Sequence, residues 1–179
     1  MKEPTVPELA KMIDHSLLHP TLTDAETRAG CELSRAYGVA TACVKPYAIR
    51  AAMDVLGGSD VMACAVIGFP HGNSTTGIKV VEAESAALAG AGEIDMVVNI
   101  GKVKGRDWAY VQREISLINQ AVVAAGALLK VIFENDYLDD GEIVRLCEIC
   151  SAVEVAFVKT STGYGFVKGG DGRYGYQGA

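Results

Sequence analysis

The stretch Val153-Glu154-Val155-Ala156-Phe157-Val158-Lys159, followed directly by Thr160-Ser161-Thr162-Gly163, is the most informative part of this chain. Its β-branched and aromatic content predicts a strand buried on both faces, and the residues after it have the composition of a loop. A lysine at the end of such a strand is costly, because desolvation disfavours its charged form. Lys159 is therefore a candidate carbonyl nucleophile that acts through an imine, although most strand-end lysines simply extend into solvent.

Apolar runs of strand length recur along the chain and alternate with helix-like patterns. The predicted strands are 11–17, 39–44, 61–69, 94–100, 128–133 and 153–159, and the predicted helices are 24–37, 47–56, 76–89, 107–125 and 139–150. The spacing of about 23 to 35 residues per strand–helix unit is typical of right-handed βαβ connections and a parallel sheet.

Six such units could form an open doubly wound sheet or most of an eight-stranded TIM (β/α)8 barrel. No G-x-G-x-x-G or Walker pattern follows a predicted strand, which disfavours the open sheet. Polar residues instead end several different strands, as in barrels: Asp14, Lys45, His71, Asn99, Glu134 and Lys159. Eight units would need about 220 residues. We therefore expect residues 1–179 to be a single incomplete barrel domain of about six units, with residues 166–179 as a Gly-rich loop or tail.

The composition describes a globular protein and excludes several classes of partner. The formal charge is −6, the pI is near 5.1 and no Lys/Arg cluster stands out, so neither nucleic acid nor an anionic membrane is an expected partner. No apolar run reaches the roughly 18 residues of a membrane span, and the N-terminus lacks a signal-peptide pattern, so we expect a cytoplasmic protein. The five cysteines and three histidines show no convincing metal-ligand spacing, and no metal is expected.

Strand alternation groups the candidate site residues. Asp95, Lys130, Glu134 and Lys159 would share the inward faces of their strands and converge on one polar cavity. Buried acids and amines can pair for purely structural reasons. At the carboxyl ends of barrel strands, however, such a set favours acid–base chemistry beside a nucleophile.

These residues lie in motifs that resemble those of deoxyribose-phosphate aldolases. Lys159-Thr160-Ser161-Thr162-Gly163 resembles the Schiff-base motif of that family. Four further stretches agree with it: Ile13-Asp14-His15-Ser16-Leu17-Leu18, Gly68-Phe69-Pro70-His71-Gly72, Glu93-Ile94-Asp95-Met96-Val97-Val98-Asn99-Ile100-Gly101 and Leu128-Leu129-Lys130-Val131-Ile132-Phe133-Glu134. The similarity covers about residues 13–165 in the family's order and spacing, and five motifs in sequence are highly specific.

The resemblance implies a class I aldolase, a lyase of deoxyribonucleotide catabolism. Such an enzyme cleaves 2-deoxy-D-ribose 5-phosphate reversibly into D-glyceraldehyde 3-phosphate and acetaldehyde, without a metal or an organic cofactor. By match to the family motifs, Lys159 would form the imine, and Asp95 would work with a water as the proton relay. Supporting or substrate-binding roles are implied for Asp14, Cys43, Lys130 and Thr162.

Three of these roles can be stated more closely from the resemblance. Thr162 would lie near the phosphate end of the substrate, and Cys43 would be a site of chemical sensitivity near the pocket. Asp14 matches the aspartate that contacts a second lysine on strand seven of the family. That lysine depresses the pKa of the nucleophile, and it is not among the 179 residues, nor are the phosphate-binding loops of strands seven and eight.

Two alternatives to an active aldolase stay open. The chain could be a catalytically impaired barrel fragment that needs a complementary C-terminal chain. It could also be another imine-forming barrel aldolase, acting on a keto acid or a ketose phosphate, although the five motifs argue against this. Because an open six-stranded barrel exposes its edges, we expect a homo-oligomer or self-association through those edges.

Overall fold

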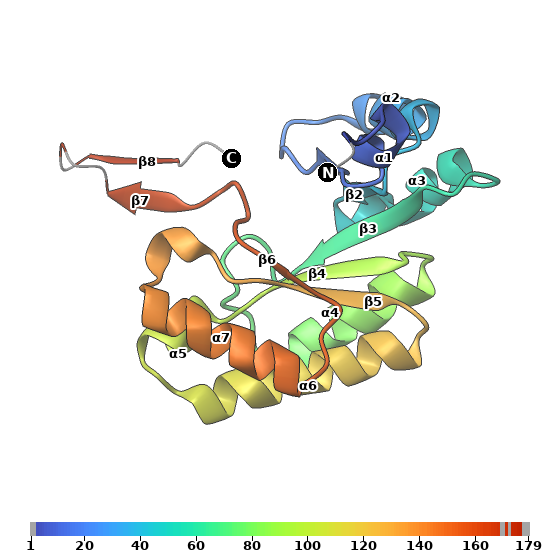
Figure 1. Ribbon diagram of the computed structural model, residues 1–179. Helices are drawn as coiled ribbons and strands as arrows, with labels where there is room; N and C mark the ends of the chain where they lie inside the picture. The colour runs from blue at the N-terminus through green and yellow to red at the C-terminus, as the bar shows by residue number, and fades with distance from the viewer. Residues whose placement is uncertain (1–2, 169–170, 172, 177–179) are drawn as a thin grey trace.

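The computed structural model describes residues 3–168, 171 and 173–176, and a parallel sheet of six strands forms its centre (Figure 1). Each strand pairs with the next one along the chain, so β1 and β6 form the two edges of the sheet. The strands are β1 (Asp14–Leu17), β2 (Thr41–Val44), β3 (Met62–Ile67), β4 (Glu93–Val97), β5 (Leu128–Ile132) and β6 (Phe157–Lys159).

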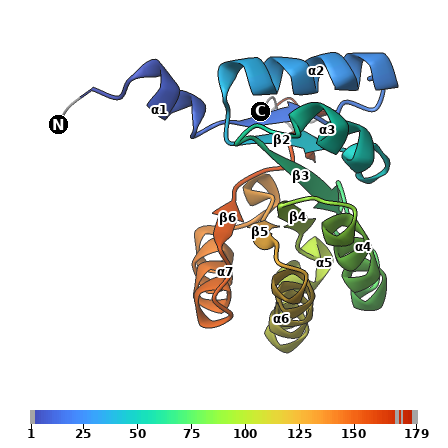
Figure 2. The ribbon, with the colours of Figure 1, turned by 90° about the vertical axis from the view of Figure 1, so that its right-hand side faces the viewer.

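Helices connect successive strands and lie outside the curled sheet, with α2 and α3 around one part of the bend and α4, α6 and α7 around the other (Figure 2). The helices are α1 (Val6–Ala10), α2 (Asp24–Tyr37), α3 (Ile49–Leu56), α4 (Thr76–Leu88), α5 (Ile100–Lys104), α6 (Trp108–Ala124) and α7 (Asp140–Ala152), with 3-10 turns η1 (Pro46–Ala48) and η2 (Asn135–Tyr137). In the described part of the chain, no helix has both the length and the apolar character that crossing a bilayer requires.

Local sequence explains where the helices begin and how closely they pack. Thr23 and Glu26 form a reciprocal capping box at the start of α2, and Asp139 and Glu142 form another at the start of α7. Gly30 lies inside α2, where a Cβ would come within 2.2 Å of the Leu17 side chain. Glycine at this position therefore lets α2 pack directly on β1.

The main apolar core lies between the outer face of the sheet and the helices. Outward residues of the central strands meet the inner faces of α4 and α6 there, among them Ala65, Ile67, Ile94, Met96, Ala83, Ile115 and Ile118. A smaller cluster of Leu18, Cys43, Cys64 and Val66 lies apart from this core, with Phe69 and Tyr164 against it. This smaller cluster shares the inner face of the sheet with the polar residues of the site.

The expected strand at 153–159 is wrong in length and in burial. Helix α7 continues to Ala152, and β6 contains only Phe157–Lys159. Phe157 and Val158 are 49% and 51% exposed. Because β6 is an edge strand, an apolar composition that predicted two buried faces instead gives two exposed side chains.

The other predicted strands and helices are confirmed with shifts at their ends, whereas α1 and α5 were not predicted. The segment expected to be a loop or tail contains two short antiparallel strands, β7 (Phe166–Lys168) and β8 (Tyr174–Tyr176). The rings of Phe166 and Tyr174 stack with centroids 5.5 Å apart, which supports this hairpin. Residues 169–170, 172 and 177–179 of that segment lie outside the described residues.

The two sheet edges lead to a first testable expectation. Among the described residues, β1 and β6 each have a strand neighbour on one side only, and free strand edges favour association. We expect the chain to associate in a concentration-dependent way, and Val158→Lys on β6 to weaken that association by about tenfold. Size-exclusion chromatography with light scattering measures this, with Val123→Lys on α6 as a control at an exposed valine away from the edge. A wild-type chain that stays monomeric at all concentrations would contradict the expectation.

Candidate active site

A pocket of about 480 Å³ contains the predicted nucleophile. The pocket lies at the carboxyl end of the sheet and is lined by Asp14, Ser16, Leu18, Phe69, Ile132, Asp136, Lys159, Thr160, Ser161, Thr162 and Gly163. The Lys159 side chain is 32% exposed, so a small ligand in the pocket can reach its amine.

Asp95 connects Lys159 to the interior of the sheet. Its carboxylate is fully buried and accepts a hydrogen bond from Lys159 Nζ through Oδ2 at 2.8 Å. The Cys64 thiol donates to Oδ1 at 3.2 Å, and Lys130 Nζ lies 3.6 Å from the same oxygen. Asp95 faces Lys130 in the β4–β5 register, which explains why these side chains meet. The predicted convergence of Asp95, Lys130 and Lys159 is therefore observed.

Lys130 is held by carboxylates on three sides. Its Nζ donates to Asp14 Oδ2 at 2.9 Å and to the carboxylate of Glu93, in addition to its contact with Asp95. Glu93 was not predicted as a site residue. Strand alternation could have identified it, because Glu93 lies two residues before Asp95 on the same face of β4.

Both lysines have raised pKa values. For Lys159, burial lowers the pKa, but the charge of Asp95, its hydrogen bond and the nearby thiols of Cys43 and Cys64 together raise it by more. For Lys130, burial is likewise outweighed by the surrounding acidic groups. The resemblance implied a depressed pKa at Lys159, and the described residues do not produce one. The physical reason is that Lys159 pairs directly with a buried carboxylate, which stabilises its charged form. The positive charge of Lys130, which would lower the pKa of Lys159, is neutralised by neighbouring carboxylates.

Cys43, Cys64 and Asp95 are the one group of His, Cys and acidic residues in the described part of the chain with spacing suited to a metal ion. Their ligand atoms lie within 4.8 Å of one another, and all three residues are buried. Contact with Cys43 and burial raise the pKa of the Cys64 thiol well above its usual value, which disfavours the thiolate that binds metal. Lys130 and Lys159 already supply positive charge at Asp95. The arrangement thus suits proton transfer better than metal binding.

Glu134 does not join the lysine cluster, contrary to the prediction from strand alternation. Strand β5 ends at Ile132, and Glu134 has a left-handed backbone with φ 59°. This conformation directs its buried carboxylate to Ser161 and Thr162 in the loop after Lys159. Thr162 accordingly lines the pocket, with both its amide and its hydroxyl hydrogen-bonded to Glu134.

The remaining polar strand ends have structural partners or lie outside the site. Asn99 caps α5 by accepting a hydrogen bond from the Lys102 amide at 3.1 Å. Lys45 Nζ donates to the Leu22 carbonyl at 2.9 Å. His71 is exposed and does not line the pocket.

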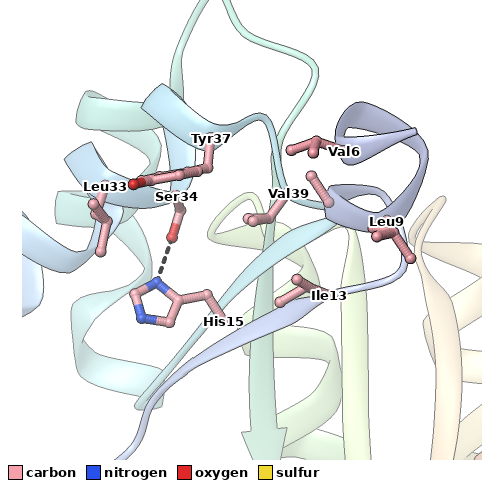
Figure 3. A pocket seen from close by; sticks show the side chains of 9 residues that line it. Val6, Leu9, Ile13, His15, Leu33, Ser34, Tyr37 and Val39 are labelled. Atoms are coloured by element: carbon pink, nitrogen blue, oxygen red, sulfur yellow. Dashed lines mark hydrogen bonds between the residues drawn. The ribbon is translucent and has the colours of Figure 1, made fainter. Parts of the chain in front are cut away.

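A second hollow, of about 330 Å³, lies between α1, β1 and α2 (Figure 3). Its lining is almost wholly apolar: Val6, Leu9, Ala10, Ile13, His15, Leu33, Ser34, Tyr37 and Val39. His15 Nδ1 lies 2.8 Å from Ser34 Oγ, which itself donates to the Gly30 carbonyl. The hydroxyl is thus fixed by structural hydrogen bonds, and the hollow has no lysine–carboxylate pair. The pocket at Lys159 is the candidate active site.

Comparisons with known proteins agree with the family resemblance of the sequence motifs. No family model matches the chain. It is 51% identical over 158 residues to the deoxyribose-phosphate aldolase of Rhodopirellula baltica, covering 88% of the chain and 66% of that protein. It is 45% identical over 165 residues to the deoxyribose-phosphate aldolase of Caldanaerobacter subterraneus, covering 92% and 71%. A Treponema denticola deoxyribose-phosphate aldolase is 45% identical over 158 residues, covering 88% and 73%. The chain thus spans from about two thirds to just under three quarters of these relatives' lengths.

Solved structures are similar as well. A crystal structure of a putative deoxyribose-phosphate aldolase from Coccidioides immitis matches with a TM-score of 0.87 at 35% identity, covering 94% of this chain and 66% of that one. A deoxyribose phosphate aldolase from Aeropyrum pernix, described as tetrameric, matches with a TM-score of 0.82 at 32% identity, covering 89% and 66%. These likenesses confirm the predicted fold class, since the six parallel strands correspond to part of an α/β barrel.

Proposed function

Because the chain belongs to the deoxyribose-phosphate aldolase family, we propose that it cleaves 2-deoxy-D-ribose 5-phosphate reversibly into D-glyceraldehyde 3-phosphate and acetaldehyde. The observation that carries this proposal is the pair of Lys159 and Asp95, 2.8 Å apart in a pocket at the carboxyl end of the sheet. An amine next to a buried carboxylate provides the nucleophile and the proton carrier that an imine mechanism needs.

The chemistry begins at Lys159. Its neutral amine attacks the C1 aldehyde of the open-chain sugar and forms a carbinolamine, which loses water to give a protonated imine. The positively charged imine accepts the electron pair of the C2–C3 bond as that bond breaks and the C3 hydroxyl loses its proton. D-Glyceraldehyde 3-phosphate leaves, and the enamine that remains gains a proton at C2 before water releases acetaldehyde and the free amine.

Asp95 is the proposed proton carrier, together with a water. It accepts a hydrogen bond from Lys159 Nζ, so it can receive a proton as the ammonium becomes an amine and return it at the carbinolamine. Lys130 supports this role, because its contacts with Glu93 and Asp14 fix it beside Asp95. Cys43 lies next to Cys64 in the β2–β3 register, and Cys64 donates to Asp95, so a modification of Cys43 would disturb the relay.

The wider proposals concern ligand, assembly and location. A sugar phosphate would enter beside residues 160–163, with Thr162 near its phosphate, and the chemistry needs no metal or organic cofactor. Residues 1–179 would act as one incomplete barrel domain. Assembly into a homo-oligomer is supported by the tetrameric aldolase among the similar structures and by the free sheet edges. A cytoplasmic location stays a prediction from the sequence.

A coupled assay tests the proposed reaction. The purified chain is given 2-deoxy-D-ribose 5-phosphate, and D-glyceraldehyde 3-phosphate is detected through NADH oxidation by coupling enzymes. Cleavage of this substrate, and not of keto acids or ketose phosphates, is expected. Activity that appears only after addition of the C-terminal third of a relative would instead favour the complementation alternative.

The pH dependence of Asp95→Asn gives a second testable expectation. Only the neutral amine attacks, so imine formation should rise with pH and level off above the pKa of Lys159. Because Asp95 raises that pKa and burial lowers it, Asp95→Asn should move the midpoint to lower pH. The same change removes the proton carrier, so turnover at the plateau should fall by about 100-fold.

Borohydride trapping with acetaldehyde across a pH series measures this midpoint. Asp136→Asn is the matched control, because Asp136 is a carboxylate that lines the same pocket but is exposed. The pH midpoint of trapping in Asp136→Asn should equal that of the wild type. An unchanged midpoint in Asp95→Asn would show that Asp95 does not control the protonation of Lys159.

A further inference from the structure

Glu134 is a buried acid that the proposed reaction does not use. It is 1% exposed, and its hydrogen-bond partners in the described part of the chain are hydroxyl and amide groups rather than a lysine or arginine. Burying a carboxylate is costly unless its oxygens are satisfied by donors. The loop after Lys159 supplies those donors.

In every hydrogen bond between the loop and the Glu134 side chain, the loop donates and the carboxylate accepts. Ser161 Oγ donates to Glu134 Oε1 at 3.0 Å, the Thr162 amide donates to the same oxygen at 3.2 Å, and the Thr162 hydroxyl donates to Oε2. The two hydroxyl oxygens in turn accept from the Gly163 amide at 3.1 Å and the Tyr164 amide at 2.9 Å. Each hydroxyl accepts from a backbone amide and donates to the carboxylate, so both hydroxyl protons are directed at Glu134. The carboxylate thereby fixes residues 161–162 directly and residues 163–164 through the two hydroxyls.

The backbone of Glu134 is held in an unfavourable conformation. Its φ of 59° and ψ of 65° lie in the left-handed region, which costs a non-glycine residue free energy. Two main-chain hydrogen bonds fix this turn to the end of β6 and the loop, from the Phe133 amide to the Lys159 carbonyl at 3.0 Å and from the Asn135 amide to the Thr160 carbonyl at 2.8 Å. The conformation aims the carboxylate at the loop instead of the lysine cluster.

We propose that Glu134 is a positioning residue that shapes the loop 160–163 and so places the phosphate-bearing part of the substrate relative to Lys159. The inference rests on the proposed function. All four residues of this loop line the pocket with Lys159, so their backbone path sets the shape of the wall nearest the nucleophile. A misplacement of about 1 Å at such a wall can cost about 100-fold in rate.

Glu134→Gly tests the role of the side chain without adding backbone strain, because glycine adopts a positive φ freely. Glu134→Gln keeps the shape of the side chain and one acceptor oxygen, so it should disturb the loop less than Glu134→Gly does. Glu154→Gly is the matched control, since Glu154 also has a φ of 59° but is exposed in the turn before β6.

Amide hydrogen exchange gives a readout that needs no catalysis. We expect exchange in a peptide covering 160–165 to become at least about tenfold faster in Glu134→Gly, less in Glu134→Gln and unchanged in Glu154→Gly. Exchange in β5 should stay as in the wild type. Unchanged exchange at the loop in Glu134→Gly would overturn the proposal.

Kinetics test the positioning role itself. In Glu134→Gly, KM for 2-deoxy-D-ribose 5-phosphate should rise at least about tenfold, while borohydride trapping with acetaldehyde, which has no phosphate, should change less than about threefold. If the rise in KM and the loss of trapping were equal in fold terms, general structural damage would explain both, and the proposal would be overturned. If the wild type proved inactive, the reaction proposed above would fail separately, and hydrogen exchange alone would decide whether Glu134 holds the loop.

Discussion

Lys159→Leu should abolish imine formation and lower the cleavage of 2-deoxy-D-ribose 5-phosphate by at least about 10⁴-fold. The amine of Lys159 is the reacting atom, and leucine fills a similar volume without a nucleophile. When the amine of Lys159 is removed, the buried carboxylate of Asp95 still has Lys130 as a partner. The measurement is turnover in the coupled assay, with circular dichroism to show that the variant is folded.

Lys102→Leu is the control for this change. Lys102 on α5 has a side chain that is 41% exposed, pairs with Asp107 and does not line the pocket, so its loss should leave turnover within about twofold of the wild type. A folded Lys159→Leu variant that retains wild-type turnover would refute the assignment of the nucleophile.

Lys79→Met should lower the free energy of unfolding by about 3–5 kcal/mol, because it leaves a buried charge without its partner. Lys79 on α4 and Glu114 on α6 are both fully buried and lie 3.1 Å apart. Burial lowers the pKa of Lys79, and Glu114 offsets part of that effect. Lys79 Nζ also donates to the Val97 carbonyl at 2.8 Å, and Glu114 accepts from the Asn99 amide at 3.2 Å. The pair thus fixes the end of β4, the strand that carries Asp95.

Urea unfolding measures this loss, and a double-mutant cycle assigns it. Lys79→Met combined with Glu114→Leu should be more stable than the sum of the two single changes predicts, because no charge is then left alone. Arg145→Met is the control, since Arg145 and its partner Glu148 are both about half exposed and the loss of that pair should cost less than about 1 kcal/mol. A loss below about 1 kcal/mol in Lys79→Met would contradict the structural role of the pair.

Strand alternation predicted much of the site, because residues two apart on a strand point to the same side. This is why Asp95 and Lys130 could be placed together, and why Lys159 could be placed beside them. The same rule failed at Glu134, because the residue lies beyond the end of β5 and its backbone turns into the left-handed region. Alternation extends only as far as the strand does.

The burial of β6 could not be predicted from its residues. Phe157 and Val158 have the composition of a central strand, but exposure depends on which neighbours a strand has in space. The protonation of Lys159 could not be predicted either. Burial alone would lower its pKa, and only the position of Asp95, 64 residues away in sequence, shows that the pKa is raised.

Reductive trapping at Lys159 tests the central claim most directly. The chain is incubated with acetaldehyde and borohydride at a pH near the midpoint of its trapping profile, digested, and mapped by mass spectrometry. We predict one ethyl group on the peptide that contains Lys159, formed much faster than on the exposed lysines, and none at that position in Lys159→Leu. Modification that is no faster at Lys159 than at Lys102, under conditions that trap the Rhodopirellula baltica relative, would contradict the assignment of Lys159 as the imine-forming residue.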